Sequence, residues 1–584
     1  MNTTRIVRVL PDGPIDKAFD YLVPDELGDQ VRVGTMVRVE LHGRRVGAWV
    51  VEDPVDPPPG VTLKPIAKVT GWGPPAELVD LAGWASWRWA GRRASFLGTA
   101  SPERAVVGLP PPSPPPPTTV IDDLGRQAFS RPRSLVRLPP AADTYPLALA
   151  AASRGNALIL TPSLAAAQHL VLRLKRAGVP VVLAGRGWAQ GLAGATVVGA
   201  RAAAWAPVGD LAGVLVLDEH DEGYAEERAP TWNARDVAIE RARRAGVPCV
   251  LVSPSPSLEA LTWGGDLLIP SRSAERAGWP ILDVVDQRRE DPRTGLYSER
   301  LVRMLRSAAS VTERGQGRVV CVLNRKGRVK LLACGACNEL ARCERCEAAV
   351  EQVEREGGPP ELRCLRCGAE RPPVCLACGG GRFKALRLGV SRVRDDLERL
   401  AGVRVVEVTG DADDLPEDAS VYIGTEAVLH RVDAVDGVAF LDIDQELLAP
   451  RYRAAEQATA LLVRAARLVG GRRTGGRVLV QTRLPKHEVI DAALHGDPGR
   501  LAAVELERRK ALSFPPCSAL AEVSGAAAAA FVDGLGRPLG VDVLGPTDGR
   551  WLLRAADHRV LCDALAAAKR PPGRLRVEVD PVRL

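Results

Sequence analysis

Eight of the twelve cysteines in this 584-residue chain lie in one short stretch, as four C-x-x-C pairs. The pairs are Cys334/Cys337, Cys343/Cys346, Cys364/Cys367 and Cys375/Cys378. A C-x-x-C turn directs two thiolates toward one point, and two such turns make the tetrahedral four-cysteine site that holds structural Zn²⁺, with Zn–S distances near ~2.3 Å. We therefore predict two zinc ions. The block contains no histidine, and four protein ligands leave no open position for catalysis, so both ions are predicted to be structural.

The spacing of the pairs predicts which cysteines share a metal. Five residues separate the first two pairs, seventeen the middle two and seven the last two. Seventeen residues suit a β-hairpin that closes the two inner pairs onto each other and brings the outer pairs together at its base. This nested arrangement is favoured over a sequential one. It assigns Cys334, Cys337, Cys375 and Cys378 to zinc 1, and Cys343, Cys346, Cys364 and Cys367 to zinc 2.

Disulfides or a redox pair are the alternative interpretation of these cysteines, but cytosolic C-x-x-C arrays are usually metal sites. The first residues, MNTTRIVRVLPDG, contain no apolar signal segment, and no run of about twenty apolar residues follows. We expect a cytoplasmic protein that does not enter the membrane. The four other cysteines stand in apolar runs and are predicted to be core residues. They are Cys249, Cys321, Cys517 and Cys562.

The length predicts several domains, and the hydrophobic content of 46% is enough for large cores. The net charge of +7 favours an anionic partner such as nucleic acid. Alternating short apolar segments predict a β-rich domain over 1–109, whose Trp84, Trp87 and Trp89 we expect to pack in a core rather than stack on bases. The run PPPSPPPP begins a proline-rich linker over 110–133.

Apolar strands that alternate with helices predict two consecutive α/β lobes with parallel sheets. Lobe one spans 134–275. Lobe two spans 276–333 and 379–505, and the cysteine module, 334–378, is inserted into it. A small α+β domain follows over 506–584. The predicted fold class is therefore multidomain α/β, with two RecA-like, helicase-type lobes.

Lobe one carries a DExH-like acidic segment but lacks a phosphate loop. Asp218, Glu219 and His220 directly follow the apolar run GVLVL, where a nucleotide motor holds Mg²⁺; a simple strand-capping role is the alternative. No G-x-x-x-x-G-K-[ST] string, whose amides and lysine would cradle the phosphates of ATP, occurs in the chain. The corresponding segment, Leu135 to Pro146, reads LVRLPPAADTYP, and Pro139 and Pro140 have no N–H to donate. The sequence therefore argues against ATP and Mg²⁺ as cofactors.

Several motifs resemble those of the primosomal protein N′ family, the bacterial replication restart proteins of the PriA type. The N-R-K-G string precedes the cysteine block, F-D-Y-L-V-P lies near the start, and L-D-I-D, R-A-A-E, S-F-P-P and V-E-V-D-P follow in order. These strings are Asn324 to Gly327, Phe19 to Pro24, Leu441 to Asp444, Arg453 to Glu456, Ser513 to Pro516, and the final VEVDP. The resemblance covers most of the chain and indicates a divergent, actinobacterial-like type that lacks the helicase motifs.

The resemblance implies that the N-terminal domain binds the 3′ end of a nascent DNA strand, and that each nested cysteine set holds one zinc. The matching pocket positions are Phe19, Asp20, Tyr21, Gly43 and Lys64. Implied partners are branched DNA (forks and D-loops), single-stranded DNA, single-stranded DNA-binding protein and helicase-loading or primosome proteins. The departures of this sequence from the family's motifs fall on the segments that bind or hydrolyse ATP in the family. Among them, Ser253-Pro254-Ser255-Pro256 replaces S-A-T-P, and VRAARLVGGRR replaces the arginine-finger segment. The family's winged-helix region is much reduced.

The favoured hypothesis is a replication restart protein, active in DNA repair and recombination, that recognises stalled forks and helps reload the replicative helicase without hydrolysing ATP. An ATP-dependent 3′–5′ DNA helicase with a degenerate nucleotide site is the first alternative, motivated by Asp218 and Glu219. A protein-interaction scaffold without DNA binding is the second alternative.

Overall fold

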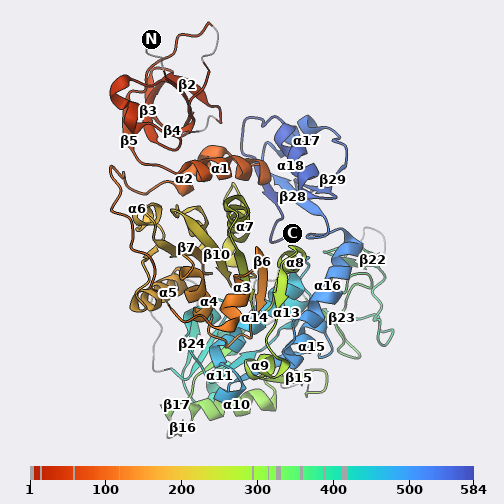
Figure 1. Ribbon diagram of the computed structural model, residues 1–584. Helices are drawn as coiled ribbons and strands as arrows, with labels where there is room; N and C mark the ends of the chain where they lie inside the picture. The colour runs from red at the N-terminus through yellow and green to blue at the C-terminus, as the bar shows by residue number, and fades with distance from the viewer. Residues whose placement is uncertain are drawn as a thin grey trace.

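The computed structural model describes residues 5–13, 16–56, 60–117, 119–291, 295–312, 315–323, 331–354, 360–385, 390–408 and 419–584. An N-terminal domain (red) stands at one end of the molecule, two α/β lobes lie below it, and a C-terminal domain (blue) lies beside helix α1 (Figure 1). The predicted fold class, multidomain α/β, is confirmed. Among the described residues, no helix combines the length and apolar character needed to cross a membrane.

The N-terminal domain is a five-stranded antiparallel sheet in the order β2-β1-β4-β3-β5. Its edges meet, because Leu22 pairs with Pro65 just before β5 and the Ile66 N–H donates to the Leu22 carbonyl at 2.9 Å. Alternate residues of β1, β3 and β4 fill the interior, as the period-2 pattern requires. The elements are β1 (Ile6–Pro11), β2 (Phe19–Leu22), η1 (Asp25–Gln30), β3 (Met36–Leu41), β4 (Arg44–Glu52) and β5 (Lys68–Gly71), followed by α1 (Ala76–Arg88) and α2 (Arg93–Ala100).

Lobe one is a seven-stranded parallel sheet in the order β14-β6-β13-β10-β7-β9-β8. Its central strands are buried on both faces, which explains their nearly continuous apolar sequences. The strands are β6 (Arg133–Arg137), β7 (Asn156–Leu160), β8 (Val181–Leu183), β9 (Thr196–Gly199), β10 (Leu211–Leu217), β13 (Cys249–Ser253) and β14 (Asp266–Leu268), with the short pair β11 (Ala225–Glu226) and β12 (Trp232–Asn233). The helices are α3 (Asp123–Ala128), α4 (Tyr145–Ala152), α5 (Leu164–Arg176), α6 (Trp188–Leu192), η2 (Arg201–Trp205), η3 (Glu222–Tyr224), α7 (Ala234–Ala245), α8 (Leu258–Thr262) and α9 (Arg272–Ala277).

The proline-rich segment runs along lobe one. The Ser113 N–H donates to the Ala193 carbonyl at 3.2 Å. Helix α3 follows, and its Ala128, together with Phe129, packs in the core of the lobe. Apart from a single bridge at Val106, the described residues from 101 to 122 form no helix or strand.

Lobe two is a six-stranded parallel sheet in the order β15-β27-β26-β18-β25-β24. Its strands are β15 (Ile281–Asp286), β18 (Val319–Val322), β24 (Val405–Val408), β25 (Val421–Gly424), β26 (Gly437–Phe440) and β27 (Arg477–Thr482), with the small hairpin β16 (Val311–Thr312) and β17 (Gly315–Gln316). Its helices are α10 (Glu299–Ala309), α11 (Val390–Ala401), α12 (Val428–Arg431), α13 (Asp444–Leu447), α14 (Ala454–Val469), η4 (Arg472–Thr474), α15 (Glu488–His495) and α16 (Gly499–Leu512).

The cysteine module is inserted after β18 and rests on lobe two. Strands β20 and β21 form an antiparallel hairpin in which Val350 pairs with Cys364. The Ala349 N–H donates to the Leu448 carbonyl at 3.0 Å, and the Arg366 guanidinium donates to the Ala449 carbonyl at 2.7 Å. The strands are β19 (Leu332–Cys334), β20 (Val350–Val353), β21 (Glu361–Cys364), β22 (Glu370–Arg371) and β23 (Phe383–Ala385).

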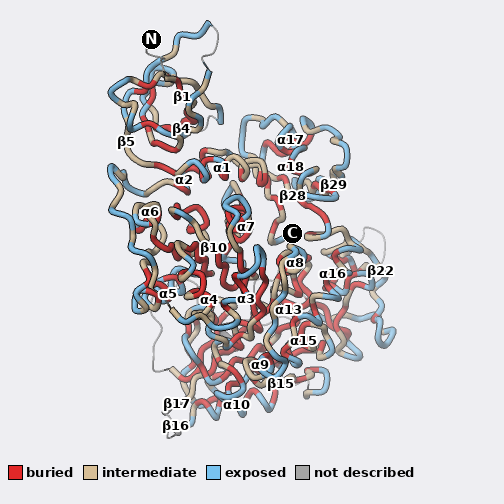
Figure 2. Tube along the Cα trace, viewed as in Figure 1, coloured by how far each residue is buried: buried red, intermediate tan, exposed pale blue. Residues whose placement is uncertain are grey.

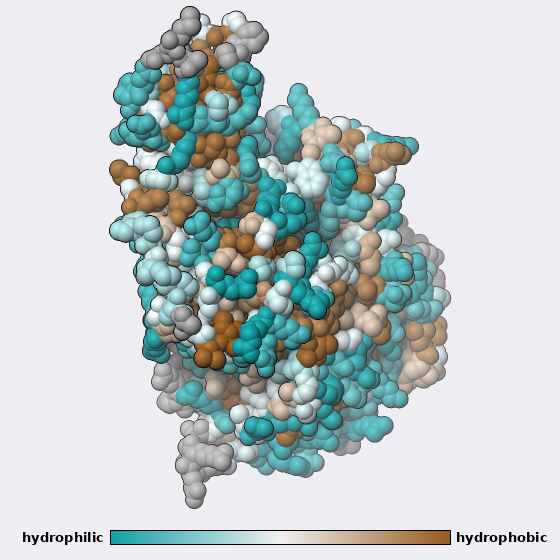
Figure 3. Space-filling view, viewed as in Figure 1, coloured by the Kyte–Doolittle hydropathy of each residue, from teal (hydrophilic) through white to brown (hydrophobic). Residues whose placement is uncertain are grey.

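The C-terminal domain is a four-stranded antiparallel sheet in the order β29-β30-β28-β31. It consists of β28 (Ala519–Ser524), α17 (Ala528–Leu535), β29 (Val541–Thr547), β30 (Arg550–Ala555), α18 (His558–Ala567) and β31 (Arg576–Val579). Buried positions (red) concentrate in the sheets of the two lobes (Figure 2). Polar and apolar residues are intermixed over the face of the molecule shown in Figure 3.

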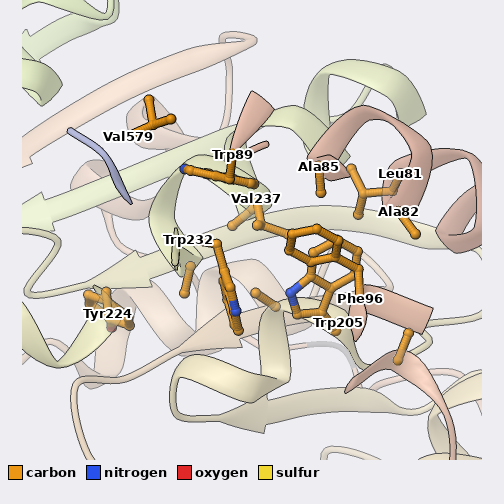
Figure 4. Close-up of a cluster of buried hydrophobic side chains, with 14 of the residues drawn as sticks. Leu81, Ala82, Ala85, Trp89, Phe96, Trp205, Tyr224, Trp232, Val237 and Val579 are labelled. Atoms are coloured by element: carbon orange, nitrogen blue, oxygen red, sulfur yellow. The ribbon is translucent and has the colours of Figure 1, made fainter. Parts of the chain in front are cut away.

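One aromatic cluster joins three parts of the chain (Figure 4). Trp89 and Phe96 of the α1–α2 region pack against Trp205 and Trp232 of lobe one, and buried residues of the C-terminal domain complete the same core. Trp84 contacts Trp89 edge-on, with ring centroids 5.2 Å apart. Trp87 is partly exposed, and its indole N–H donates to Asp563 at 2.8 Å. Trp84 and Trp89 therefore pack in this core as expected, whereas Trp87 does not.

The prediction for the four scattered cysteines is correct at three positions and wrong at one. Cys249, Cys321 and Cys562 are buried, whereas Cys517 is exposed. Cys517 follows two prolines in the connection between α16 and β28, so its apolar neighbours do not place it in a strand or helix of the core.

Candidate functional site

The structure brings the eight cysteines of the module into two groups of four. Within each group all four sulfur atoms lie within 4.8 Å of one another. The outer group is Cys334, Cys337, Cys375 and Cys378, and the inner group is Cys343, Cys346, Cys364 and Cys367. This is the nested arrangement expected from the spacing of the pairs.

The sulfur separations suit a metal and not a disulfide. Cys334 and Cys378 Sγ are 3.6 Å apart, and Cys346 and Cys364 Sγ are 3.5 Å apart. A disulfide bond is ~2.05 Å long, whereas four thiolates placed ~2.3 Å from a central Zn²⁺ lie roughly 3.8 Å from one another. Four soft thiolate donors in a tetrahedral group favour zinc over magnesium or calcium.

All four C-x-x-C turns have the same backbone. In each, the residue after the second cysteine has a positive φ, between 59° and 75°, and its N–H donates to the carbonyl of the first cysteine at 2.9–3.0 Å. These residues are Asn338, Glu347, Gly368 and Gly379. Glycine and asparagine are the residues that tolerate this left-handed conformation best. Gly368, Gly379 and Asn338 were thus a further signal of the knuckles in the sequence.

Backbone N–H groups also favour the thiolate form of one cysteine in the outer group. Hydrogen bonds from the N–H groups of Cys337 and Ala336 lower the pKa of Cys334 to about 6. The thiolate is the form that binds a metal.

The candidate 3′-end pocket is built around the end of β3. The Tyr21 hydroxyl donates to the Glu40 carbonyl at 2.8 Å, and Lys64 Nζ lies 2.7 Å from Glu40 Oε1. Tyr21 points into the interior of the closed N-terminal sheet, where burial raises the pKa of its phenol. Glu40, absent from the predicted set, therefore links two of the predicted pocket residues.

The other three pocket positions have different surroundings. Asp20 lies on the outer face of β2, and its carboxylate accepts from Arg8 Nε at 2.8 Å. Phe19 is partly buried and packs against the hydrophobic core of the N-terminal sheet. Gly43 follows His42 in the two-residue turn between β3 and β4, and both have positive φ. Such a hairpin turn requires glycine-like residues on its own account.

Asp218 of the DExH-like segment is bound by lobe two. It follows β10, and both of its carboxylate oxygens accept from Arg467 of α14, at 2.7 and 2.8 Å. Arg467 Nε also donates to the Pro140 carbonyl at 3.2 Å. Burial opposes ionisation of Asp218, but the Arg467 charge lowers its pKa below the usual value. One arginine therefore joins the acidic segment to the loop where a phosphate cradle would lie.

Glu219 and His220 also have protein partners. Glu219 accepts from the Ser257 N–H at 2.8 Å and from the Ser257 hydroxyl at 2.7 Å, and it pairs with Arg235 at 3.2 Å. His220 Nδ1 lies 2.8 Å from the Ser253 hydroxyl oxygen. The Glu219 side chain is fully buried, so neither of its oxygens faces an open coordination site.

Several backbone amides of the loop after β6 are hydrogen-bonded within the protein. The Ala142 N–H donates to the Pro139 carbonyl at 2.9 Å, and the Tyr145 N–H donates to Asp143 Oδ1 at 2.9 Å. The Ala141 N–H is also bonded, to the Gly278 carbonyl at 3.3 Å. Asp143 forms a bidentate pair with Arg173. The amides of Ala141, Ala142 and Tyr145 therefore already have partners within the protein.

A cavity of about 1170 Å³ lies between the two lobes and the C-terminal domain. Aspartates and glutamates outnumber arginines among its lining residues, which include Asp218, Glu259 and Arg453. Several of these carboxylates are paired with arginines of the same lining, among them Asp218 with Arg467 and Glu259 with Arg453.

Comparison with known proteins decides the family. The family model for the PriA 3′DNA-binding domain (3′BD) matches residues 8–102. The chain is 30% identical to the probable replication restart protein PriA of Mycobacterium leprae, over 91% of this chain and 90% of that one. The chain belongs to the PriA family of replication restart proteins. The probable PriA of Mycobacterium tuberculosis H37Rv is 28% identical over 91% of this chain and 89% of its own length.

Matches to other relatives are more partial. The replication restart protein PriA of Bacillus subtilis is 28% identical over 56% of this chain and 43% of its own. Among solved structures, yeast Dbp5 bound to RNA and ADP BeF3 is 11% identical, with a TM-score of 0.36 and coverage of 67% of this chain and 93% of that one. A DEAD box protein from Methanococcus jannaschii has a TM-score of 0.30 at 9% identity, over 67% of this chain and 88% of its own.

Several PriA-family motifs meet where the two lobes contact the C-terminal domain. Arg453 pairs with Glu259 of α8 at 2.6 Å, and the Tyr452 ring stacks on Phe514 with centroids 5.2 Å apart. The Tyr452 hydroxyl donates to the Pro581 carbonyl at 2.9 Å. The segments R-A-A-E, S-F-P-P and V-E-V-D-P thus form one junction. The N-R-K-G string, Asn324 to Gly327, lies outside the described residues.

Arg509 of α16 is the centre of this junction, and the sequence analysis missed it. It is 1% exposed, pairs with Glu505 at 3.1 Å and with Glu456, and donates to the Pro515 carbonyl at 2.9 Å. Its counter-ion Glu456 is 53 residues away in the sequence, so no local pattern could have identified the pair.

Proposed function

We propose that this PriA-family protein recognises stalled forks and D-loops by their DNA structure and helps reload the replicative helicase without hydrolysing ATP. The observation that carries the proposal is the contact of Arg467 with both Asp218 and Pro140. In a nucleotide motor these segments would face the phosphates and Mg²⁺. Here Arg467 bridges them, and Glu219 accepts from Ser257 and pairs with Arg235. The lobes then serve as a scaffold.

The proposal assigns separate tasks to the parts of the chain. Residues 1–109 grip the 3′ end through Phe19, Asp20, Tyr21, Gly43 and Lys64, where an aromatic ring can stack on the terminal base and a carboxylate can accept from a free 3′ hydroxyl. Residues 334–378 hold two structural Zn²⁺ ions, and those ions fix the shape of the module. Single-stranded DNA-binding protein and helicase-loading proteins are the proposed protein partners, in the bacterial cytoplasm.

The fit of zinc rests on the donor set. Four thiolates within 4.8 Å of one another, on turns of identical backbone, match a four-cysteine site. When bound, zinc would supply cross-links in a module whose buried apolar cluster is small.

The 3′-end assignment predicts discrimination between fork ends. The full-length protein should bind a fork with a free nascent 3′ hydroxyl roughly tenfold more tightly than the same fork with a 3′ phosphate, since a hydrogen bond to a charged group is lost and two anions meet. Fluorescence anisotropy at fixed salt measures both affinities. Asp20→Asn should reduce the ratio.

Glu52→Gln is the matched control for that variant. Glu52 also pairs with Arg8, at 2.8 Å, but is no pocket residue, so the ratio should be unchanged in it. Equal affinity of the unaltered protein for free and blocked ends would rule out the pocket.

A further inference from the structure

The outer face of the N-terminal sheet carries unpaired cations in adjacent positions. Arg38 of β3 and Lys68 of β5 lie directly opposite each other in the antiparallel register, and both are exposed. Within the part of the chain that the structure describes, neither has a carboxylate within salt-bridge distance. Like charges directly opposite each other on a sheet are destabilising. The pair therefore costs the domain stability unless a negatively charged ligand neutralises it.

The neighbouring position on the other side of Arg38 is a glycine. Gly47 of β4 pairs with Arg38 in the register, in the middle of a nine-residue strand. Its φ is not in the left-handed region, and a Cβ placed there would meet only Asp12 Cβ, at 3.9 Å. Neither the backbone nor the packing thus requires glycine. A glycine inside a strand often marks the place where another backbone approaches closely.

The same face continues to the candidate pocket. Glu40 is two residues beyond Arg38 on β3, on the same side of the sheet, and binds Lys64. Arg45 of β4 stands opposite Glu40 in the register and is exposed. A row of cations therefore leads from Lys68 and Arg38 to the residues around Tyr21.

We infer that Arg38, Lys68 and Gly47 form a phosphate-binding surface for the DNA strand whose 3′ end enters the pocket. The guanidinium and the ammonium group contact phosphates behind the terminal nucleotide, and Gly47 lets the sugar-phosphate backbone lie close to the sheet. Phosphate contacts of this kind position the strand and carry no base information. The inference rests on the proposed function, because it takes the N-terminal domain as the DNA-end site.

The test is binding of the full-length Arg38→Ala/Lys68→Ala protein to fluorescein-labelled forks with free and with phosphate-blocked 3′ ends. Both affinities should fall by the same factor, roughly tenfold at low salt. The slope of log K against log salt should fall by about 2, about 1 for each contact removed. The midpoint of thermal unfolding should stay constant or rise, because the like-charge pair is gone. A merely structural role would lower the midpoint instead.

Two further variants separate this surface from general charge effects. Gly47→Val should weaken fork binding without loss of stability, since valine favours strands and its Cβ would meet only Asp12 Cβ, at 3.9 Å. Lys175→Ala/Arg176→Ala removes the same charge from exposed positions of α5 and should leave affinity and salt slope unchanged.

If Arg38→Ala/Lys68→Ala binds forks as tightly as the unaltered protein does, the surface is refuted while the proposed function stands. If the unaltered protein binds no branched DNA, both fail. If discrimination between ends is absent but the double variant binds weakly, the surface holds and the pocket does not.

Discussion

Replacing Cys343 with serine is expected to release one metal ion per chain and to leave the other in place. Cys343 Sγ lies 3.5 Å from Cys367 Sγ in the inner group, and a neutral serine hydroxyl is a poor ligand for zinc. Structural Zn²⁺ binds zinc-finger peptides with an apparent free energy of about 10–16 kcal/mol, so loss of a ligand should unfold the inner half of the module. Metal analysis of the purified protein should give about one zinc in place of two.

Double variants test the pairing itself. Cys343→Ser/Cys364→Ser should still retain one zinc, because both residues belong to the inner group. Cys334→Ser/Cys343→Ser should retain none, because each residue belongs to a different group. Cys517→Ser, at an exposed cysteine outside both groups, should keep two. One remaining zinc in Cys334→Ser/Cys343→Ser would favour the sequential pairing.

Replacing Arg509 with alanine is expected to destabilise the junction of the two lobes and the C-terminal domain by about 3 kcal/mol. Arg509 and Glu505 are 1% and 3% exposed, and Glu456 and the Pro515 carbonyl also accept from Arg509. The substitution removes one counter-ion from each carboxylate, leaving Glu505 with Arg508 at 2.6 Å and Glu456 with Arg453 at 3.8 Å. Weakening the pairing of buried charges costs more than the loss of a surface pair. Chemical denaturation followed by far-UV circular dichroism measures the change.

Arg500→Ala is the matched control on the same helix. Arg500 pairs with Asp491 at 2.7 Å, but both side chains are at least 40% exposed. An exposed ion pair contributes about 0–1 kcal/mol, so this variant should unfold close to the unaltered protein. Equal destabilisation by the two variants would mean that burial of Arg509 does not stabilise the junction.

The sequence predicted best what local spacing determines. The two cysteine groups follow from gaps of a few residues, and the parallel sheets follow from apolar runs such as LAGVLVL of β10. It could not predict contacts between distant segments. Arg467 and Asp218 are 249 residues apart, so the lack of a G-x-x-x-x-G-K-[ST] string was visible in the sequence while the ion pair between these two residues was not.

Residue type alone also predicted poorly whether a side chain is buried and what it contacts. Cys517 is exposed although it was expected in a core, because the turn after α16 carries it outward. Arg509 is buried although arginine is mostly exposed in proteins. Gly43 is a pocket position only by resemblance, and its positive φ in the β3–β4 turn accounts for the glycine without any ligand. Burial and partners in these cases depend on tertiary contacts that one sequence does not display.

The central claim is that Arg467, Ser257 and Arg235 bind the carboxylates of the DExH-like segment in this PriA-family chain, and that the chain does not hydrolyse ATP. Phosphate release from ATP, measured with the full-length protein and saturating forked DNA, tests it most directly. We predict a rate equal to the background without protein, at DNA concentrations where fork binding is complete, and the same rate for Glu219→Gln. Fork-stimulated ATP hydrolysis that Glu219→Gln abolishes would contradict the claim and favour an ATP-dependent helicase.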